Sequence, residues 1–169
     1  MNKPKAQPYP SSKIKVGAVL YSASAGTDDG KTYTEISEWI VRSIRAKRGT
    51  KSRNGVIAPF AEHARKYVNL IAKVEFVTWG KVSGKTGDRG WLKSIPTYCR
   101  RQFAVGDDLP TGIYTTIRAA VLYEIAVAEG RVAWYKKEIE GGAAAADLTE
   151  EQMEIEAELK ALKRRLAKL

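Results

Sequence analysis

The residues of this sequence best suited to ligand chemistry are cations that lack acidic neighbours. No carboxylate occurs between Trp39 and Ala61, and the stretch carries six basic residues: Arg42, Arg45, Lys47, Arg48, Lys51 and Arg53. Lys and Arg neutralise phosphates and release the counterions condensed on a nucleic acid, which favours binding. If the stretch is helical, positions 42, 45 and 48 line one face and can meet phosphates together. The alternative is a solvated face, a common role of charge runs.

Two further basic groups lie nearer the middle of the chain. Segment 80–90 (GKVSGKTGDRG) combines four glycines with three cations, so its backbone is free to follow a phosphate chain. The flanking tryptophans either stack on an unpaired base or pack in the core. Together with two arginines beside Tyr98, these groups extend the predicted nucleic-acid contacts to Lys81, Lys85, Arg89, Trp91, Lys93, Arg100 and Arg101.

The sequence offers few residues for catalysis. Its one histidine, His63, and its one cysteine, Cys99, provide no Cys/His zinc cluster and almost no choice of nucleophile–base pair. The adjacent acids at 28–29 and 107–108 lie close to glycines, where Asp usually serves turns and caps rather than proton transfer. We therefore expect no catalytic residue, no metal site and no cofactor.

Residues 25–32 (AGTDDGKT) have the spacing of a phosphate-binding loop in which alanine replaces the first glycine. Such a loop points backbone N–H groups and its lysine, here Lys31, at phosphates, with Thr32 available for magnesium. Asp28 and Asp29 would place negative charge inside that loop, and no later apolar strand ends in a suitable metal-binding Asp. A turn followed by a capped helix is the preferred interpretation, and a nucleotide-binding loop is the alternative.

Charge is distributed unevenly along the chain. The 169 residues carry a net charge of +10 and have a pI near 9.7. Residues 1–106 hold 20 Lys and Arg against 7 Asp and Glu, whereas residues 109–169 hold 9 against 10. We expect the first part to face an anionic partner and the second part to act as a scaffold.

Several other protein classes are disfavoured by composition. A hydrophobic content of 44% suffices for a folded core. No apolar stretch approaches the roughly 18 residues of a transmembrane helix, and Val16–Tyr21 is too short for a secretory signal. A lone cysteine cannot form an internal disulfide, so a reducing compartment fits. We expect a cytoplasmic protein without a membrane partner.

The elements that must position these residues are expected to be mainly α-helical. Residues 1–12 are Pro-rich and predict a flexible arm, and the alternation over Ile14–Tyr21 with the turn at Asp29-Gly30 predicts a short N-terminal strand or hairpin. The capping-box spacing of Thr32 and Glu35 predicts a helix ending near Gly49. A second helix is expected from Pro59 to Val74.

The remainder of residues 13–141 completes this basic, mainly helical domain. Apolar positions over Trp91–Phe103 predict one or two short helices. The nearly continuous apolar run over Ile113–Ala128 predicts a central buried helix that continues to Ile139 and ends at Gly141.

Residues 147–169 predict a separate C-terminal amphipathic helix, because acidic residues come early and basic residues late, which complements the helix dipole. Its apolar residues follow a heptad pattern. They either form a coiled coil in a homodimer or fold back on their own domain. The predicted oligomerisation residues are Leu148, Ile155, Leu159, Leu162, Leu166 and Leu169.

Taken together, these patterns favour a non-catalytic accessory or regulatory protein that binds DNA or RNA through phosphates. A second hypothesis is an assembly component, such as a small viral or mobile-element accessory protein, that docks on an acidic protein. A nucleotide-binding protein is the third.

Overall fold

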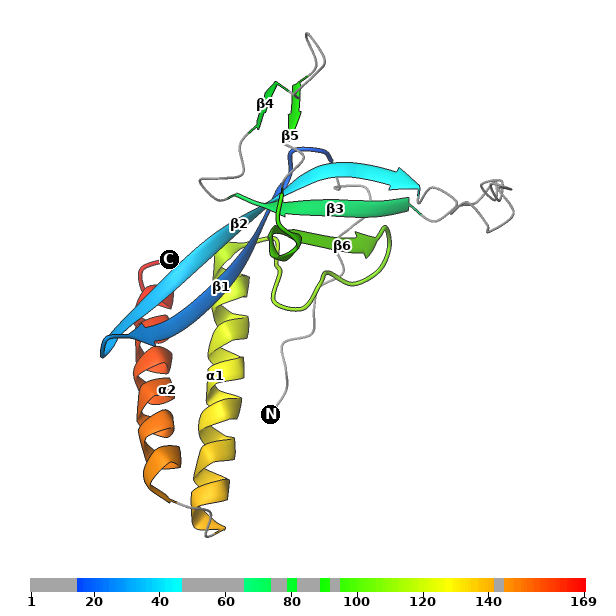
Figure 1. Cartoon of the computed structure of the whole chain (residues 1–169). Helices are drawn as coiled ribbons and strands as arrows, with labels where there is room; N and C mark the ends of the chain where they lie inside the picture. Colours follow the sequence, from blue (N-terminus) through cyan, green and yellow to red (C-terminus); the bar gives the residue numbers. More distant parts are fainter. Residues whose placement is uncertain (1–14, 47–65, 74–78, 82–88, 92–94, 142–144) are drawn as a thin grey trace. The chain divides into compact units, whose positions relative to one another are not determined.

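The structure, a computed structural model, describes residues 15–46, 66–73, 79–81, 89–91, 95–141 and 145–169 (Figure 1). Strands β1, β2, β3 and β6 form an antiparallel sheet in the order β1-β2-β3-β6, and β4 pairs with β5. The expectation of a mainly α-helical domain is therefore wrong. The elements are β1 (Val19–Asp28), β2 (Lys31–Ala46), β3 (Lys66–Ala72), β4 (Trp79–Lys81), β5 (Arg89–Trp91), the 3-10 helix η2 (Thr97–Cys99), β6 (Arg100–Ala104), α1 (Ile117–Glu140) and α2 (Ala145–Leu166).

The hairpin that joins β1 to β2 is longer than predicted. Asp29 and Gly30 form its two-residue turn, and both have positive φ angles, of 48° and 70°. This combination matches the twist of antiparallel strands and explains why Asp-Gly is favoured there. Because Lys31 and Thr32 continue as a strand, the segment lacks the helix N-terminus that a phosphate-binding loop requires.

Strand β2 replaces the first predicted helix. Exposure alternates from Lys31 to Ile36, as on a half-buried strand. A β-bulge between Val41 and Ser43 then shifts the alternation by one residue. The shift gives the apolar residues of β2 a spacing that imitates a helix, which is why the prediction failed.

Strand β3 replaces the described part of the second predicted helix. It lies between β2 and β6, and both of its faces carry buried apolar side chains. Val68, Leu70, Ile71 and Ala72 are all buried. Such a run on a central strand cannot be distinguished from a helical stripe by periodicity alone. Within the described part of the region where short helices were predicted, η2 is the only helical segment, and Arg100–Ala104 forms β6.

The described residues divide into two compact units. Unit 1 comprises Leu20–Ser37 and Thr111–Leu169, and unit 2 comprises Glu38–Pro110 with the residues up to Val19. The described part of unit 2 carries nine Lys and Arg against three Asp and Glu, whereas unit 1 carries 10 against 13. The cationic excess of the described residues therefore belongs to unit 2. The predicted arm, residues 1–12, lies outside the described residues.

Unit 1 is built on an antiparallel pair of helices. Thr116 caps α1 by accepting a hydrogen bond from the Ala119 amide at 3.2 Å, and Gly141 ends the helix. Ion pairs cross to α2 from Glu129 and Lys136. The shared core contains Val121, Ile125, Ala128, Val132, Ile155 and Leu162, with Ala23, Ala25 and Ile36 of the β1–β2 hairpin packed against it. Of the helices in the described ranges, none has the length and apolarity of a bilayer span.

The heptad residues of α2 take part in this intramolecular packing. Ile155 and Leu162 are buried, and Leu159 and Leu166 are partly buried against the same core. Leu169 remains 50% exposed. The structure thus has the folded-back arrangement, and oligomerisation through this helix stays a prediction.

Candidate nucleic-acid interface

The bulge in β2 decides where its arginines lie. Val41 pairs with Leu70 and Ser43 pairs with Asn69, so Arg42 is an extra residue without a partner on β3. Side chains of a regular strand alternate, which would place positions 42 and 45 on opposite faces. A bulge of this kind directs two successive side chains to the same side. Arg42, Ser43 and Arg45 therefore share one face of the sheet.

A third arginine comes from β6. Arg100 pairs with Ile71, and Gln102 pairs with Asn69, so both lie on the face that carries Ser43. Burial lowers the pKa of the Arg42 guanidinium, and the positive charges of Arg100 and Arg45 lower it further. The Arg42 guanidinium thus lies close enough to Arg45 and to Arg100 to be repelled by both. We call the residues of this surface the arginine face: Arg42, Ser43, Arg45, Asn69, Arg100 and Gln102.

The arginine face retains unused binding capacity. Arg100 donates to the Ile95 carbonyl, which orients it. Arg42 and Arg45 are exposed, and neither has a hydrogen bond or ion pair within the described part of the chain.

The few acidic residues described in unit 2 are occupied elsewhere or lie beyond the strands. Glu38 is bound to Lys73 at 2.8 Å. Asp107 and Asp108 follow the end of β6, where the Asp107 amide donates to the Ala104 carbonyl in a turn. No carboxylate contributes to the pKa shift of Arg42. Among the described residues, no carboxylate therefore neutralises the arginine face.

The opposite face of the sheet is apolar and holds the fourth predicted arginine of this region. Arg101 lies over the Trp39 ring at 5.1 Å and donates to the carbonyls of Tyr98 and Arg100. Val41, Leu70 and Phe103 are buried on this side. Arg100 and Arg101, predicted as one basic pair, are thus separated by strand alternation, and Arg101 has a packing role.

The other predicted nucleic-acid contacts do not join the arginine face in the described part of the chain. The expected helical row of positions 42, 45 and 48 is wrong, since β2 is a strand to Ala46. The backbone of β4 and β5 pairs Lys81 with Arg89, and Trp79 with Trp91. The predicted contacts outside the described residues are Lys47, Arg48, Lys51, Arg53, Lys85 and Lys93.

Three polar residues of the arginine face were missed by sequence reasoning. Ser43, Asn69 and Gln102 are separated by 26 and 33 positions and meet only through strand register. Residues so far apart in the sequence form no local motif, so their hydrogen-bonded row could not be predicted from spacing.

The structure also bears on catalysis. Cys99 is buried and has no disulfide partner among the described residues. Within the described ranges, no three His, Cys, Asp or Glu side chains are grouped as metal ligands would be. His63 lies outside these ranges.

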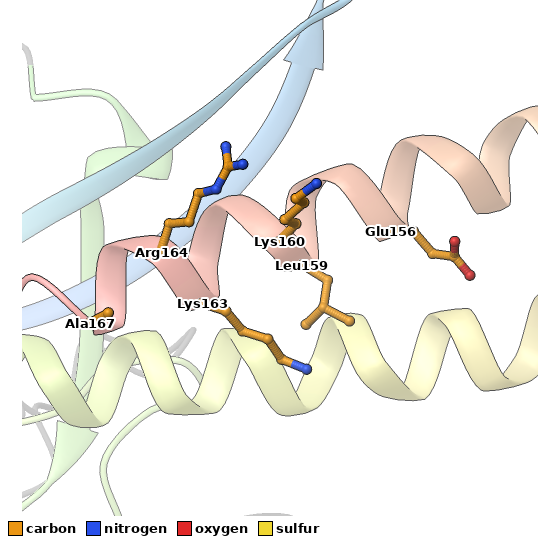
Figure 2. A pocket seen from close by; sticks show the side chains of 6 residues that line it. All are labelled: Glu156, Leu159, Lys160, Lys163, Arg164 and Ala167. Carbon is orange, nitrogen blue, oxygen red and sulfur yellow. The ribbon is translucent and has the colours of Figure 1, made fainter.

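Unit 1 presents a different cationic feature, an open groove of about 470 Å³ along α2 (Figure 2). Its lining residues are Glu156, Leu159, Lys160, Lys163, Arg164 and Ala167. Figure 2 shows Lys163 and Leu159 directed toward α1. Lys163 is bound to Glu129 at 2.9 Å and Glu156 to Lys136 at 3.4 Å. Lys160 and Arg164 have no such partner among the residues that the structure describes.

Comparison with protein-family models, with curated proteins and with solved structures finds no match for this chain. Its function has to be inferred from its own residues.

Proposed function

We propose that this protein is a non-catalytic nucleic-acid-binding protein whose arginine face contacts phosphates. The observation that carries the proposal is the placement of Arg42, Arg45 and Arg100 on one face of the sheet, with no carboxylate among the described residues of that face. Like charges held together raise the energy of the free protein, and a polyanion relieves that repulsion. The single buried cysteine fits a reducing compartment, and we place the protein in the cytoplasm.

The choice of arginine supports a phosphate ligand. The guanidinium group is planar and presents its donors as a fork that matches two phosphate oxygens, whereas a lysine ammonium acts as a point charge. Arg42 and Arg45 have this donor capacity unused within the described residues. Binding of this kind is dominated by counterion release and weakens steeply with salt.

The proposal is tested by measuring the affinity for DNA and RNA oligonucleotides over a range of salt concentrations. Arg42→Ala and Arg45→Ala should each weaken binding. Each should also reduce the slope of log K against log salt by about 0.7 to 0.9, the contribution of one phosphate contact. Far-UV circular dichroism verifies that the variants keep the fold.

Lys160→Ala/Arg164→Ala is the matched control. It removes two exposed cations from unit 1, where acids balance the charge, and should leave the slope at the wild-type value. If neither DNA nor RNA binds at low salt, or if the control loses as much slope as the arginine variants, the proposal is wrong.

A second candidate function, docking on an acidic protein, is favoured by the groove on α2. Its lining includes the apolar Leu159 and Ala167 and two cations, Lys160 and Arg164, that have no ion pair within the described ranges (Figure 2). An acidic segment with apolar side chains would match both features. Loss of an acidic partner in the Lys160→Ala/Arg164→Ala variant, with unchanged behaviour of the arginine variants, would support this function instead.

A further inference from the structure

A row of polar side chains crosses the arginine face at right angles to its strands. The Asn69 amide donates to the Ser43 hydroxyl at 3.1 Å, and the Gln102 amide donates to the Asn69 side-chain oxygen at 2.8 Å. The three residues come from β2, β3 and β6, which are neighbours in the sheet. With strands about 4.8 Å apart, the row is about 10 Å long.

The hydrogen bonds of the row fix the side chains of Ser43, Asn69 and Gln102. Some of their donors and acceptors are not used within the row. Each carboxamide has two N–H donors and one oxygen acceptor, and a hydroxyl can both donate and accept. The Gln102 side chain is exposed and uses one donor in the row. Its oxygen and second N–H remain without a partner in the described part of the chain. These groups are the complement of a nucleobase edge.

The arginines lie on both sides of the row. Along the strand direction, Arg45 is level with Tyr67, the row is level with Asn69, and Arg100 is level with Ile71. The four residues from position 67 to position 71 separate the two levels by about 13 Å. A strand whose phosphates contact Arg45 and Arg100 would therefore carry its bases across the polar row.

A single strand matches this arrangement better than a duplex does. Its base edges lie inside grooves that admit a helix or a two-stranded ribbon. The polar row instead spans three strands of a sheet face, with arginines on either side. Bases of a single strand can turn outward, hydrogen-bond along their edges and stack on guanidinium planes.

We propose that the arginine face binds single-stranded nucleic acid, with Arg42, Arg45 and Arg100 on phosphates and the Ser43–Asn69–Gln102 row on base edges. This inference rests on the proposed nucleic-acid-binding function and adds the class of ligand. Counterion release alone gives duplex DNA the steeper electrostatic advantage at low salt. A higher affinity for the single strand than for the duplex would therefore indicate contacts to bases in addition to phosphate contacts.

The experiment uses the full-length protein with a labelled single strand of mixed sequence, competed by the unlabelled single strand or by its blunt duplex. The single strand should compete at least about tenfold better. Gln102→Ala should weaken single-strand binding about fivefold or more, which is the low end for a lost base contact, while the salt slope stays at the wild-type value. Gln152→Ala, on α2 of unit 1, is the matched glutamine control and should bind like wild type.

The possible outcomes distinguish a failure of the single-strand inference from a failure of the proposed nucleic-acid-binding function. Equal or better competition by the duplex, or wild-type affinity of Gln102→Ala, overturns the single-strand inference. Loss of salt slope in the arginine variants would still uphold nucleic-acid binding in that case. Absence of any binding at low salt overturns both.

Discussion

Thr27, on β1, carries the one side-chain hydroxyl that is buried without a hydrogen-bond partner among the described residues. A hydroxyl removed from water without a partner costs about 1 to 3 kcal/mol. Valine has nearly the same shape and an equal preference for strands. The position therefore stores an unfavourable contribution that one substitution can remove.

We predict that Thr27→Val raises the free energy of unfolding by about 1 kcal/mol, because it removes the unpaired hydroxyl and keeps the packing. Urea unfolding followed by circular dichroism measures the change. Thr27→Ser keeps the hydroxyl and removes the methyl group, so it should not stabilise the protein. A Thr27→Val variant less stable than wild type would show that the hydroxyl has a partner in solution.

At the scale of single residues, the sequence predicted part of the arginine face. Arg42, Arg45 and Arg100 stood out because cations without nearby acids need an anionic partner or solvent. Their approach to one another could not be predicted, since it depends on a one-residue bulge and on register with β3. The same alternation that brings Arg100 onto the face turns Arg101 away, and adjacent cations give no sign of this in the sequence.

Among the helices, the α1–α2 pair contains two carboxyl groups whose pKa is raised. Burial raises the pKa of Glu158, a nearby Arg131 at 3.6 Å opposes the rise, and Glu154 adds to it. Burial likewise raises the pKa of Glu124, and the charge of Glu158 contributes to that rise. The folded protein therefore holds these protons more tightly than the unfolded chain does.

The raised pKa of Glu158 determines how its contribution to folding stability changes with pH. Where the folded pKa exceeds the unfolded one, folding takes up protons, so the stability contribution is present at low pH and is lost as the pH rises through the folded pKa. Above its folded pKa, the ionised Glu158 thus costs stability. The exposed guanidinium of Arg131 offsets little of this cost, because solvent screens it.

We predict that Glu158→Gln increases the melting temperature relative to wild type more near pH 7 than near pH 5, because glutamine does not ionise. Thermal unfolding of both proteins at the two pH values gives the comparison. Glu150→Gln, at an exposed position of α2, is the control and should show no such pH-dependent difference. A difference that is constant or reversed with pH would contradict the assignment.

At the scale of elements, the helices were predicted and most strands were not. α1 and α2 are marked by local signals, namely an apolar stripe, a glycine at the end of α1 and a charge gradient along α2. β2 and β3 are specified by partners far away in sequence. Their apolar residues lie on both faces of the sheet, and the bulge in β2 makes the register irregular. The Thr32–Glu35 pair that suggested a helix cap lies on a half-buried strand instead.

For the whole molecule, the division of charge coincides with the division into units. The proposed ligand contacts lie in unit 2, whereas the packing of α2 on α1 belongs to unit 1. Stability of the helix pair and affinity of the arginine face are therefore expected to respond to different substitutions.

We predict that Leu162→Ala, which truncates a side chain only 1% exposed, lowers the free energy of unfolding by about 3 kcal/mol. Leu169→Ala, at the same heptad position but 50% exposed, should change it by less than about 0.5 kcal/mol. Denaturant unfolding measures both. At a temperature where both variants remain folded, their nucleic-acid affinities should stay within about twofold of wild type. A large affinity loss in Leu162→Ala would link the two units.

The irregularity at Arg42 also determines how β2 can change length during evolution. Removing the codon for Arg42 would leave Trp39, Val41 and Ile44 facing the interior in an uninterrupted strand. Removing Ile40 or Ile44 would instead move the side chains on one side of the deletion to the opposite face of the sheet. Deletion of Arg42 is therefore expected to exchange one cation for a regular strand while both halves of β2 keep their faces.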